Sequence, residues 1–247
     1  LSYTGEPITP AVTVTYGMQT LDIDTDYAVV YEDNFNTGVA KVIVKGYGNY
    51  TGKKELTFTI NPKGITAQMV SVQNEDLVYN GEAQLPQLNV VDGEFLLAEG
   101  TDYVINSVGG VNVGTYTVEL QGKGNYTTAE SIKRTYNITP LGIAQIDVEN
   151  VAAPVAGEVL PTTIDAIYEG VDAISSISWS PAPVNGVAAP ETEYTATIVL
   201  TSNYNYMFMR NTLVNINGEK ASSVVDSMGR LIVSYTFAKT GELNSIE

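Results

Sequence analysis

Residues that could do chemistry stand out first in a glycine-rich sequence that occurs twice. Residues 45–52 read KGYGNYTG and residues 121–128 read QGKGNYTT. A glycine loop cradles phosphate when a helix follows it, because the N-terminus of that helix faces the anion. The alternating apolar and polar residues that follow each copy predict a strand instead. We therefore interpret both copies as turns and not as phosphate-binding loops.

The turn residues are the positions that both copies share. Glycine and asparagine accept the positive φ angles that bulges and hairpin turns require. A tyrosine comes next, and we expect it to fold over the end of a core with its hydroxyl near the loop backbone or water. The structural positions assigned in this way are Gly46, Gly48, Asn49, Tyr50, Gly122, Gly124, Asn125 and Tyr126.

An acidic run at residues 22–26, DIDTD, has the beginning of a calcium-binding pattern. An EF-hand loop continues with glycine and carries glutamate at its twelfth position. This chain has Tyr27 and Asp33 in those places. Of the acids in the run, Asp26 alone recurs in the second copy, as Asp102. We predict no metal site here and expect both aspartates to cap a turn with their side-chain oxygens.

Tyr47 is a candidate for ligand binding within the repeated sequence. The second copy has Lys123 at this position, so the fold does not require an aromatic side chain there. An exposed tyrosine presents a flat apolar ring with a polar edge, which suits stacking on a sugar or a peptide. The alternative is a solvated loop tyrosine that binds nothing.

A second aromatic stretch, SNYNYMFMR, occupies residues 202–210. Aromatic and methionine side chains are typical of adaptable binding surfaces. Alternation along a strand would turn Tyr206 and Phe208 towards the core. The outward residues would then be Tyr204, Met207 and Met209, of which Tyr204 and Met207 join Tyr47 as ligand-binding candidates. Core closure or packing between domains is the alternative role of this stretch.

Composition excludes several classes of function. The chain of 247 residues has 12 basic and 28 acidic side chains, and its formal net charge of -16 disfavours nucleic acid and anionic lipid as partners. It contains no histidine and no cysteine, which removes imidazole-based triads, thiol nucleophiles and zinc sites built from those residues. We predict no cofactor. The sequence has no apolar stretch of membrane-spanning length and opens without signal-peptide features, so we expect a mature protein or a fragment that does not insert into a membrane.

Strands account for most of the pattern. Ala40, Val42 and Val44 alternate with Lys41 and Lys45, as a strand with one buried face requires. Turn residues recur at short intervals between such runs, which predicts antiparallel β-sandwiches of the immunoglobulin-like type. We expect Trp179, the single tryptophan, to be a core residue of one of them.

An internal repeat divides the chain. The sequence YTGE at 3–6 returns as YNGE at 79–82, and TFTINPKG at 57–64 returns as TYNITPLG at 135–142. The repeat predicts one domain at 1–62 that lacks its first strand, a second at 63–140 and a third sandwich of a related kind at 141–247. We expect further copies upstream, and an edge of the first domain that stays unpaired or borrows a strand.

The first copy, from YTGEPITPAVTVTYG to KGYGNYTGKKELTFTI, closely resembles the immunoglobulin-like repeat domains of MBG and YDG type found in bacterial cell-surface proteins. Residues 65–139 resemble them more loosely, and residues 155–237 resemble another bacterial immunoglobulin-like module. The resemblance implies tandem sandwiches in an elongated array, displayed outside the cell, with adjacent repeats as neighbours and no catalytic residues.

These observations favour a non-catalytic spacer segment of an adhesin-like surface protein. The alternative is an adhesin module that binds a host or bacterial surface glycan or protein through exposed aromatic residues. An enzyme is the least favoured class, because glycoside hydrolysis without histidine or cysteine needs two facing carboxylates in a cleft and the acids here fall in turns.

Overall fold

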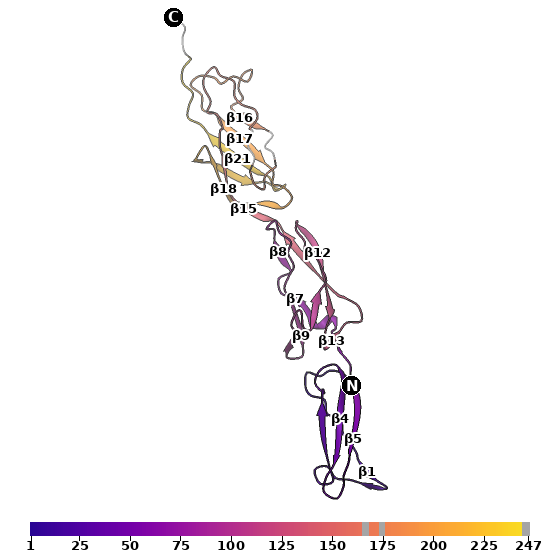
Figure 1. The fold of residues 1–247 in the computed structure, drawn as a ribbon. Coiled ribbons are helices and arrows are strands. Elements are labelled where there is room, and N and C mark those ends of the chain that lie inside the picture. The colour runs from indigo at the N-terminus through magenta and orange to yellow at the C-terminus, as the bar shows by residue number, and fades with distance from the viewer. Residues whose placement is uncertain (165–167, 173–175, 244–247) are drawn as a thin grey trace. The chain divides into compact units, whose positions relative to one another are not determined.

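A computed structural model describes residues 1–164, 168–172 and 176–243 of the chain. The described residues form strands in several sheets, with one short 3-10 turn and no α-helix, which confirms the predicted all-β class and is consistent with β-sandwich packing (Figure 1). Within that part of the chain no helix has the length and apolar character to cross a membrane.

The chain forms two compact units that divide the second repeat between them. The first unit contains residues 1–75, 85–109 and 116–136, and the second contains residues 76–84, 110–115 and 137–247. The domain boundaries predicted from the sequence repeat therefore stay a prediction, and the two units are described separately.

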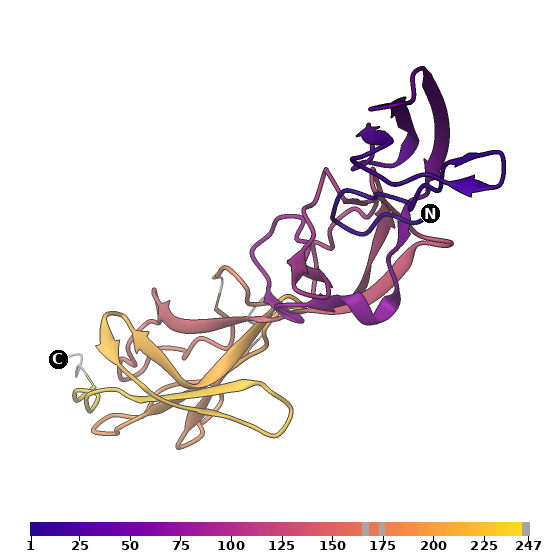
Figure 2. The same ribbon diagram turned by 90° about the horizontal axis from the view of Figure 1, so that it is seen from below.

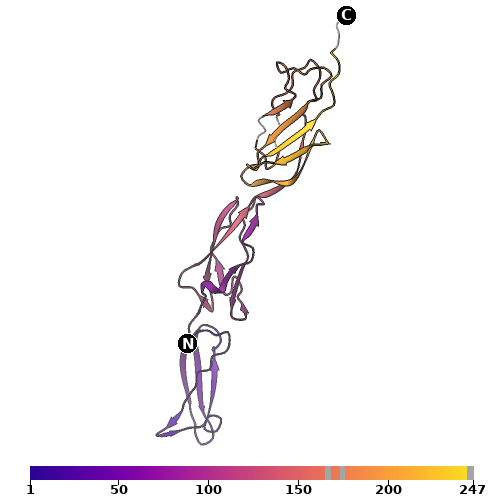
Figure 3. The same ribbon diagram turned by 180° about the vertical axis from the view of Figure 1, so that it is seen from behind.

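The first repeat, within the first unit, is built on a three-stranded antiparallel sheet. Its strands are β3 (Tyr27–Glu32), β4 (Gly38–Gly46) and β5 (Lys53–Ile60), which lie side by side in Figure 3. Ala40 and Val42 of β4 are buried while Lys41 and Lys45 are exposed, as the alternation predicts, but Val44 is only partly buried and Ile43, on the opposite face, is buried as well. A small hairpin, β1 (Thr15–Tyr16) and β2 (Gln19–Thr20), accompanies the sheet.

Residues 63–136 repeat this arrangement and add strands to it. The counterparts of β1 and β2 are β9 (Leu88–Asp92) and β10 (Phe95–Leu96), and those of β3 and β4 are β11 (Tyr103–Ile105) and β12 (Gly114–Gly122). The additional elements are β6 (Lys63–Gly64), the 3-10 turn η1 (Ala67–Met69) and β7 (Val70–Val72), which pairs with β9. A short strand, β13 (Tyr126–Thr127), pairs in parallel with β6.

The second unit holds a parallel contact between β8 (Asp76–Val78) and the end of β14 (Ile132–Thr139). Its larger part is a pair of sheets with a common core (Figures 1 and 2). One sheet contains β15 (Leu141–Val148), β18 (Tyr206–Ile216) and β19 (Glu219–Lys220). The other contains β16 (Ile177–Ser180), β17 (Thr195–Leu200), β21 (Leu231–Thr236) and β20 (Ser222–Val225).

Burial within these two sheets follows the predicted alternation. The inward side chains Ala196, Ile198 and Leu200 of β17 are fully buried. Trp179 differs from the prediction, because it is only partly buried and packs at the margin of the core. Its indole N–H donates to the Pro161 carbonyl at 2.7 Å, which satisfies the polar edge of a ring that packs on apolar side chains.

Candidate functional site

The repeated glycines allow two backbone segments to approach closely. Gly48 and Gly124 have φ angles of 62° and 65°, and a Cβ on either would lie 2.8 Å from a threonine carbonyl oxygen. A Cβ on Gly46 or Gly122 would lie within 2.9 Å of the backbone of the residue five positions later. The amide of residue 123, between the two glycines of the second copy, donates to the Asp102 carbonyl at 2.8 Å. This amide is therefore engaged by the fold and is not presented to an anion.

The recurrent aspartates cap the neighbouring turn. Asp26 accepts a hydrogen bond from the amide of Asp22 at 2.9 Å, and Asp102 accepts one from Ala98 at the same distance. Both carboxylates therefore serve their own loops, as predicted from the sequence. Within the described residues no group of three or more acidic side chains is arranged to hold a metal ion.

Asn125 and Tyr126 form a junction with the first repeat inside the first unit. The Asn125 side-chain oxygen accepts the Thr37 amide at 2.9 Å, and its Nδ2 donates to the Asn36 side chain at 2.9 Å. The Asn125 carbonyl accepts the Lys63 amide at 2.9 Å. Tyr126 meets Tyr3 edge to face, with ring centroids 5.6 Å apart. We call this set of contacts the first junction.

Asn205 and Tyr206 make the same set of contacts inside the second unit. The Asn205 side-chain oxygen accepts the Val113 amide at 2.9 Å, and its Nδ2 donates to the Asn112 side chain at 3.0 Å. The Asn205 carbonyl accepts the Leu141 amide at 3.0 Å. Tyr206 meets Tyr79 edge to face at 5.4 Å. We call this set the second junction, and its four contacts correspond one by one to those of the first.

The first junction contains a buried polar group. Asp92, which is 8% exposed, receives the Tyr126 hydroxyl at 3.1 Å and pairs with the Lys63 ammonium at 2.6 Å. Burial, followed by the hydrogen bond to Asp92, raises the pKa of Tyr126. The phenol therefore stays protonated and acts as a donor, and it is not poised as a base. Its partner is a carboxylate and not the loop backbone or water expected from the sequence.

The second junction has a more exposed polar support. The Tyr206 hydroxyl donates to Glu169 at 2.9 Å, and this hydrogen bond is the main cause of its raised pKa. The Tyr204 hydroxyl donates to the Val113 carbonyl at 2.8 Å. Tyr204 therefore contributes to the junction although most of its ring is open to solvent.

The three ligand-binding candidates are all exposed, and they belong to different units. Tyr47, in the first unit, is 61% exposed. Tyr204 and Met207, in the second unit, are 71% and 47% exposed. Met207 lies in β18 opposite Gly142 of β15, and the buried side chain next to it is Phe208.

Sequence reasoning missed three asparagines that build the junctions. Asn36 and Asn112 lie at equivalent positions of the two repeats, each two residues before a glycine, so a repeated Asn-x-Gly pattern was available as a signal. Asn205 was passed over within the aromatic stretch 202–210. The signal for Asn205 is the dipeptide Asn-Tyr. It occurs at 205–206, well downstream of the linker that begins at Pro140, as it occurs at 125–126 downstream of the linker that begins at Pro62.

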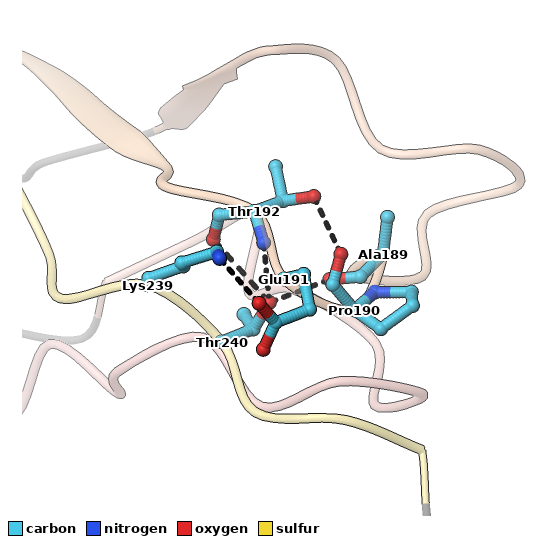
Figure 4. Close-up of polar contacts among 6 residues, drawn as sticks. All are labelled: Ala189, Pro190, Glu191, Thr192, Lys239 and Thr240. Atoms are coloured by element: carbon cyan, nitrogen blue, oxygen red, sulfur yellow. Dashed lines mark hydrogen bonds and ion pairs between the residues drawn. The ribbon is translucent and has the colours of Figure 1, made fainter.

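A further polar cluster lies in the second unit (Figure 4). The buried Thr240 hydroxyl donates to the Ala189 carbonyl at 2.7 Å and accepts the Thr192 amide at 2.9 Å. Lys239 and Glu191 form an ion pair beside it. This hydroxyl is fully engaged in attaching the C-terminal segment to a loop, so we assign it a structural role.

Comparison with other proteins adds no identification. No protein-family model matches the chain, and neither a curated protein nor a solved structure matches it significantly.

Proposed function

We propose that this chain is a non-catalytic spacer segment of a bacterial cell-surface protein, built from tandem immunoglobulin-like modules in an extended array. The observation that carries the proposal is the equivalence of the two junctions. Asn125 and Asn205 each bond a loop amide, a loop asparagine and a linker amide, and the tyrosine that follows each packs on a second tyrosine.

Such junctions suit a spacer because they oppose bending. Each hydrogen bond contributes about 0.5–1.5 kcal/mol net, and three around one asparagine fix a loop and a linker in one orientation. The linkers that they hold, which begin at Pro62 and Pro140, are short and already restricted by proline. A module held in this way transmits its orientation to the next one.

Extracellular display rests on the resemblance to MBG and YDG repeats. The recurrent glycines allow close backbone approach within their turns, and the recurrent aspartates accept amide hydrogen bonds from their own loops. The proposal therefore assigns them structural roles and no catalytic one. Adjacent repeats of the same polypeptide are the partners that the junctions would engage.

Junction stiffness can be measured by distances between spin labels, since the chain has no native cysteine to remove. Labels at Thr57→Cys and Glu130→Cys report on the first junction, and labels at Glu82→Cys and Glu219→Cys report on the second. We expect a narrow distance distribution for each pair.

Asn125→Ala should broaden the first distribution alone, and Asn205→Ala the second alone. Asn49→Ala is the matched control, because Asn49 occupies the same turn position in the first repeat, and it should change neither distribution. A broad distribution for both pairs in the unsubstituted background would refute the spacer.

The second candidate function is an adhesin module that binds a glycan or a protein. The exposure of the Tyr47 and Tyr204 rings favours it. Binding on a glycan array or in a pull-down should then disappear in Tyr47→Lys, which copies the second repeat, or in Tyr204→Ala. Absence of binding across such panels would remove this candidate.

A further inference from the structure

The first repeat contains an open pocket at a position that is filled in the second repeat. The pocket has a volume of about 320 Å³ and is lined in part by Val14, Leu21, Tyr27, Val44, Tyr50 and Thr51. Three of these side chains, Val14, Val44 and Tyr50, are partly exposed. Their counterparts in the second repeat, Val90, Leu120 and Tyr126, are all buried.

The segment that covers the equivalent surface of the second repeat is residues 63–72. Ile65 and Val70 of this segment are 5% and 4% exposed. The Ile65 amide donates to the Thr127 carbonyl at 2.7 Å, and Val70 lies opposite Val90 in the ladder between β7 and β9. The first-repeat counterparts of Thr127 and Val90 are Thr51 and Val14, and both line the open pocket.

The edge beside the pocket is also prepared for a strand. Residues 12–14 correspond to the part of β9 that pairs with β7, and residue 11 corresponds to Gln87, whose carbonyl accepts the Gln73 amide, yet residues 11–14 belong to no described strand. The hairpin after them keeps the register of its counterpart, with Tyr16 opposite Gln19 as Asp92 is opposite Phe95. The backbone is therefore in place, and an apolar strand is what the edge lacks.

We propose that this pocket and edge, formed by residues 11–14 and the lining of the pocket, are an acceptor site for the linker strand of a preceding module of the same kind. The acceptor site would take a segment with the pattern of residues 63–72, with one β-branched side chain in the pocket and another opposite Val14. The inference rests on the tandem arrangement of the proposed function and specifies what the exposed end of the first repeat binds.

A second copy of this chain is a poorer occupant. Its own residues 63–72 are engaged in its second repeat, where Ile65 and Val70 are buried, so it could donate them only by opening that repeat. A linker strand joined to the same polypeptide has no such cost and acts at high effective concentration.

The acceptor site also specifies one side chain of its occupant. In the second repeat Lys63 pairs with Asp92, but the counterpart of Asp92 in the first repeat is Tyr16, which packs on Tyr50 with ring centroids 5.9 Å apart. Tyr16 therefore offers no carboxylate to a lysine, and the carboxylate of Asp26, which also lines the pocket, accepts the Asp22 amide. An apolar residue, such as the leucine found at position 141 of the other linker, fits this place better.

The experiment adds a second copy of residues 61–76 directly before Leu1, which reproduces the spacing of the second repeat. Hydrogen exchange at the Thr13 amide is the measurement. Its counterpart Asn89 lies opposite Ser71 at a hydrogen-bonded position of the ladder, because Gln73 donates to Gln87 two residues further on. We expect exchange at Thr13 to slow by about tenfold or more and the first repeat to melt at a higher temperature.

Two variants of the added copy sharpen the test, and neither alters the native chain. In the added copy, aspartate at the positions equivalent to Ile65 and Val70 (Ile65→Asp with Val70→Asp) should abolish the protection of the Thr13 amide. Leucine at the position equivalent to Lys63 (Lys63→Leu) should retain or increase that protection. The proposal would be overturned if the unsubstituted extension left exchange at the Thr13 amide unchanged, or if the double aspartate variant protected this amide equally well.

A wild-type dimer with a protected Thr13 amide would assign the acceptor site to a second copy and would also overturn it. The spin-label distances across the second junction distinguish this failure from failure of the spacer, because they do not involve the acceptor site.

Discussion

The first and second junctions make the same contacts with different surroundings. Counting back from the shared Asn-Tyr pair, Gly122 and Gly124 of the first junction correspond to Ser202 and Tyr204 of the second. A Gly-x-Gly turn is therefore not needed to position the asparagine. The glycines serve the turn of the repeat, and the Asn-Tyr pair serves the junction.

The supports of the two linkers differ as well. The first linker pairs through the two-residue strand β6 and adds the contact between Lys63 and Asp92. The second continues into β15, whose 8 residues run beside β18. The short backbone pairing of the first linker is thus supplemented by an ion pair with the buried Asp92. The longer strand pairing of the second linker stabilises it through more backbone hydrogen bonds.

The largest difference between the junctions should appear when alanine replaces the residue three positions before the asparagine. Gly122→Ala would place a Cβ 2.6 Å from the Thr127 backbone, and such overpacking should cost about 3 kcal/mol. Ser202→Ala, at the corresponding position of the second junction, should change stability by less than about 0.5 kcal/mol. Calorimetric unfolding of both variants checks this, and equal effects would refute the division of roles.

Removing the acidic partner of each tyrosine should have the next largest effect. Asp92→Ala leaves the buried Tyr126 hydroxyl without its acceptor and should cost about 1–3 kcal/mol. Glu169→Ala removes an exposed partner of Tyr206 and should cost less than about 0.5 kcal/mol. Denaturant unfolding measures both, and a larger loss for Glu169→Ala would reverse the comparison.

Replacing the asparagines should affect the junctions about equally. Asn125→Ala removes the acceptor of the Thr37 amide, and Asn205→Ala that of the Val113 amide. We expect about 1 kcal/mol in each case, seen as faster hydrogen exchange at the released amide. Faster hydrogen exchange at only one of the two amides would show that the two asparagines contribute unequally to stability despite their equivalent contacts.

The smallest effect should be a difference in alkaline stability. Burial and Asp92 raise the pKa of Tyr126, so the folded state keeps the phenol protonated while the unfolded chain loses the proton near pH 10. This stabilisation is complete below about pH 10 and is lost as the pH rises, by about 0.8 kcal/mol at pH 10.5. Tyr126→Phe should flatten this part of the stability curve, whereas Tyr206→Phe should change it less because Tyr206 is more exposed. Unfolding between pH 9 and 11 tests both variants.

Local pattern predicted the all-β class and the positive φ angles of Gly48 and Gly124, but Asn49 and Asn125 do not adopt the positive φ that the sequence suggested. Alternation identified the buried face of β4 because side chains in a strand point to opposite sides in turn. The aspartate caps were predictable for a similar reason, since Asp26 and Asp102 bond amides only four residues away. Trp179 shows the limit, because its place at the core margin depends on a carbonyl from another part of the domain.

The partners of Asn125 and Asn205 lie beyond any local pattern. Asn125 bonds an amide 88 residues away, and Asn205 one at a separation of 92. No propensity or period connects positions so far apart, because only tertiary packing brings them together. The amino-acid sequence alone thus determined the all-β class, the repeat and its turns, because these depend on neighbouring residues. Tertiary structure decided which distant loops Asn125 and Asn205 bond and that the first repeat has an open pocket, because both depend on which distant segment lies against a surface.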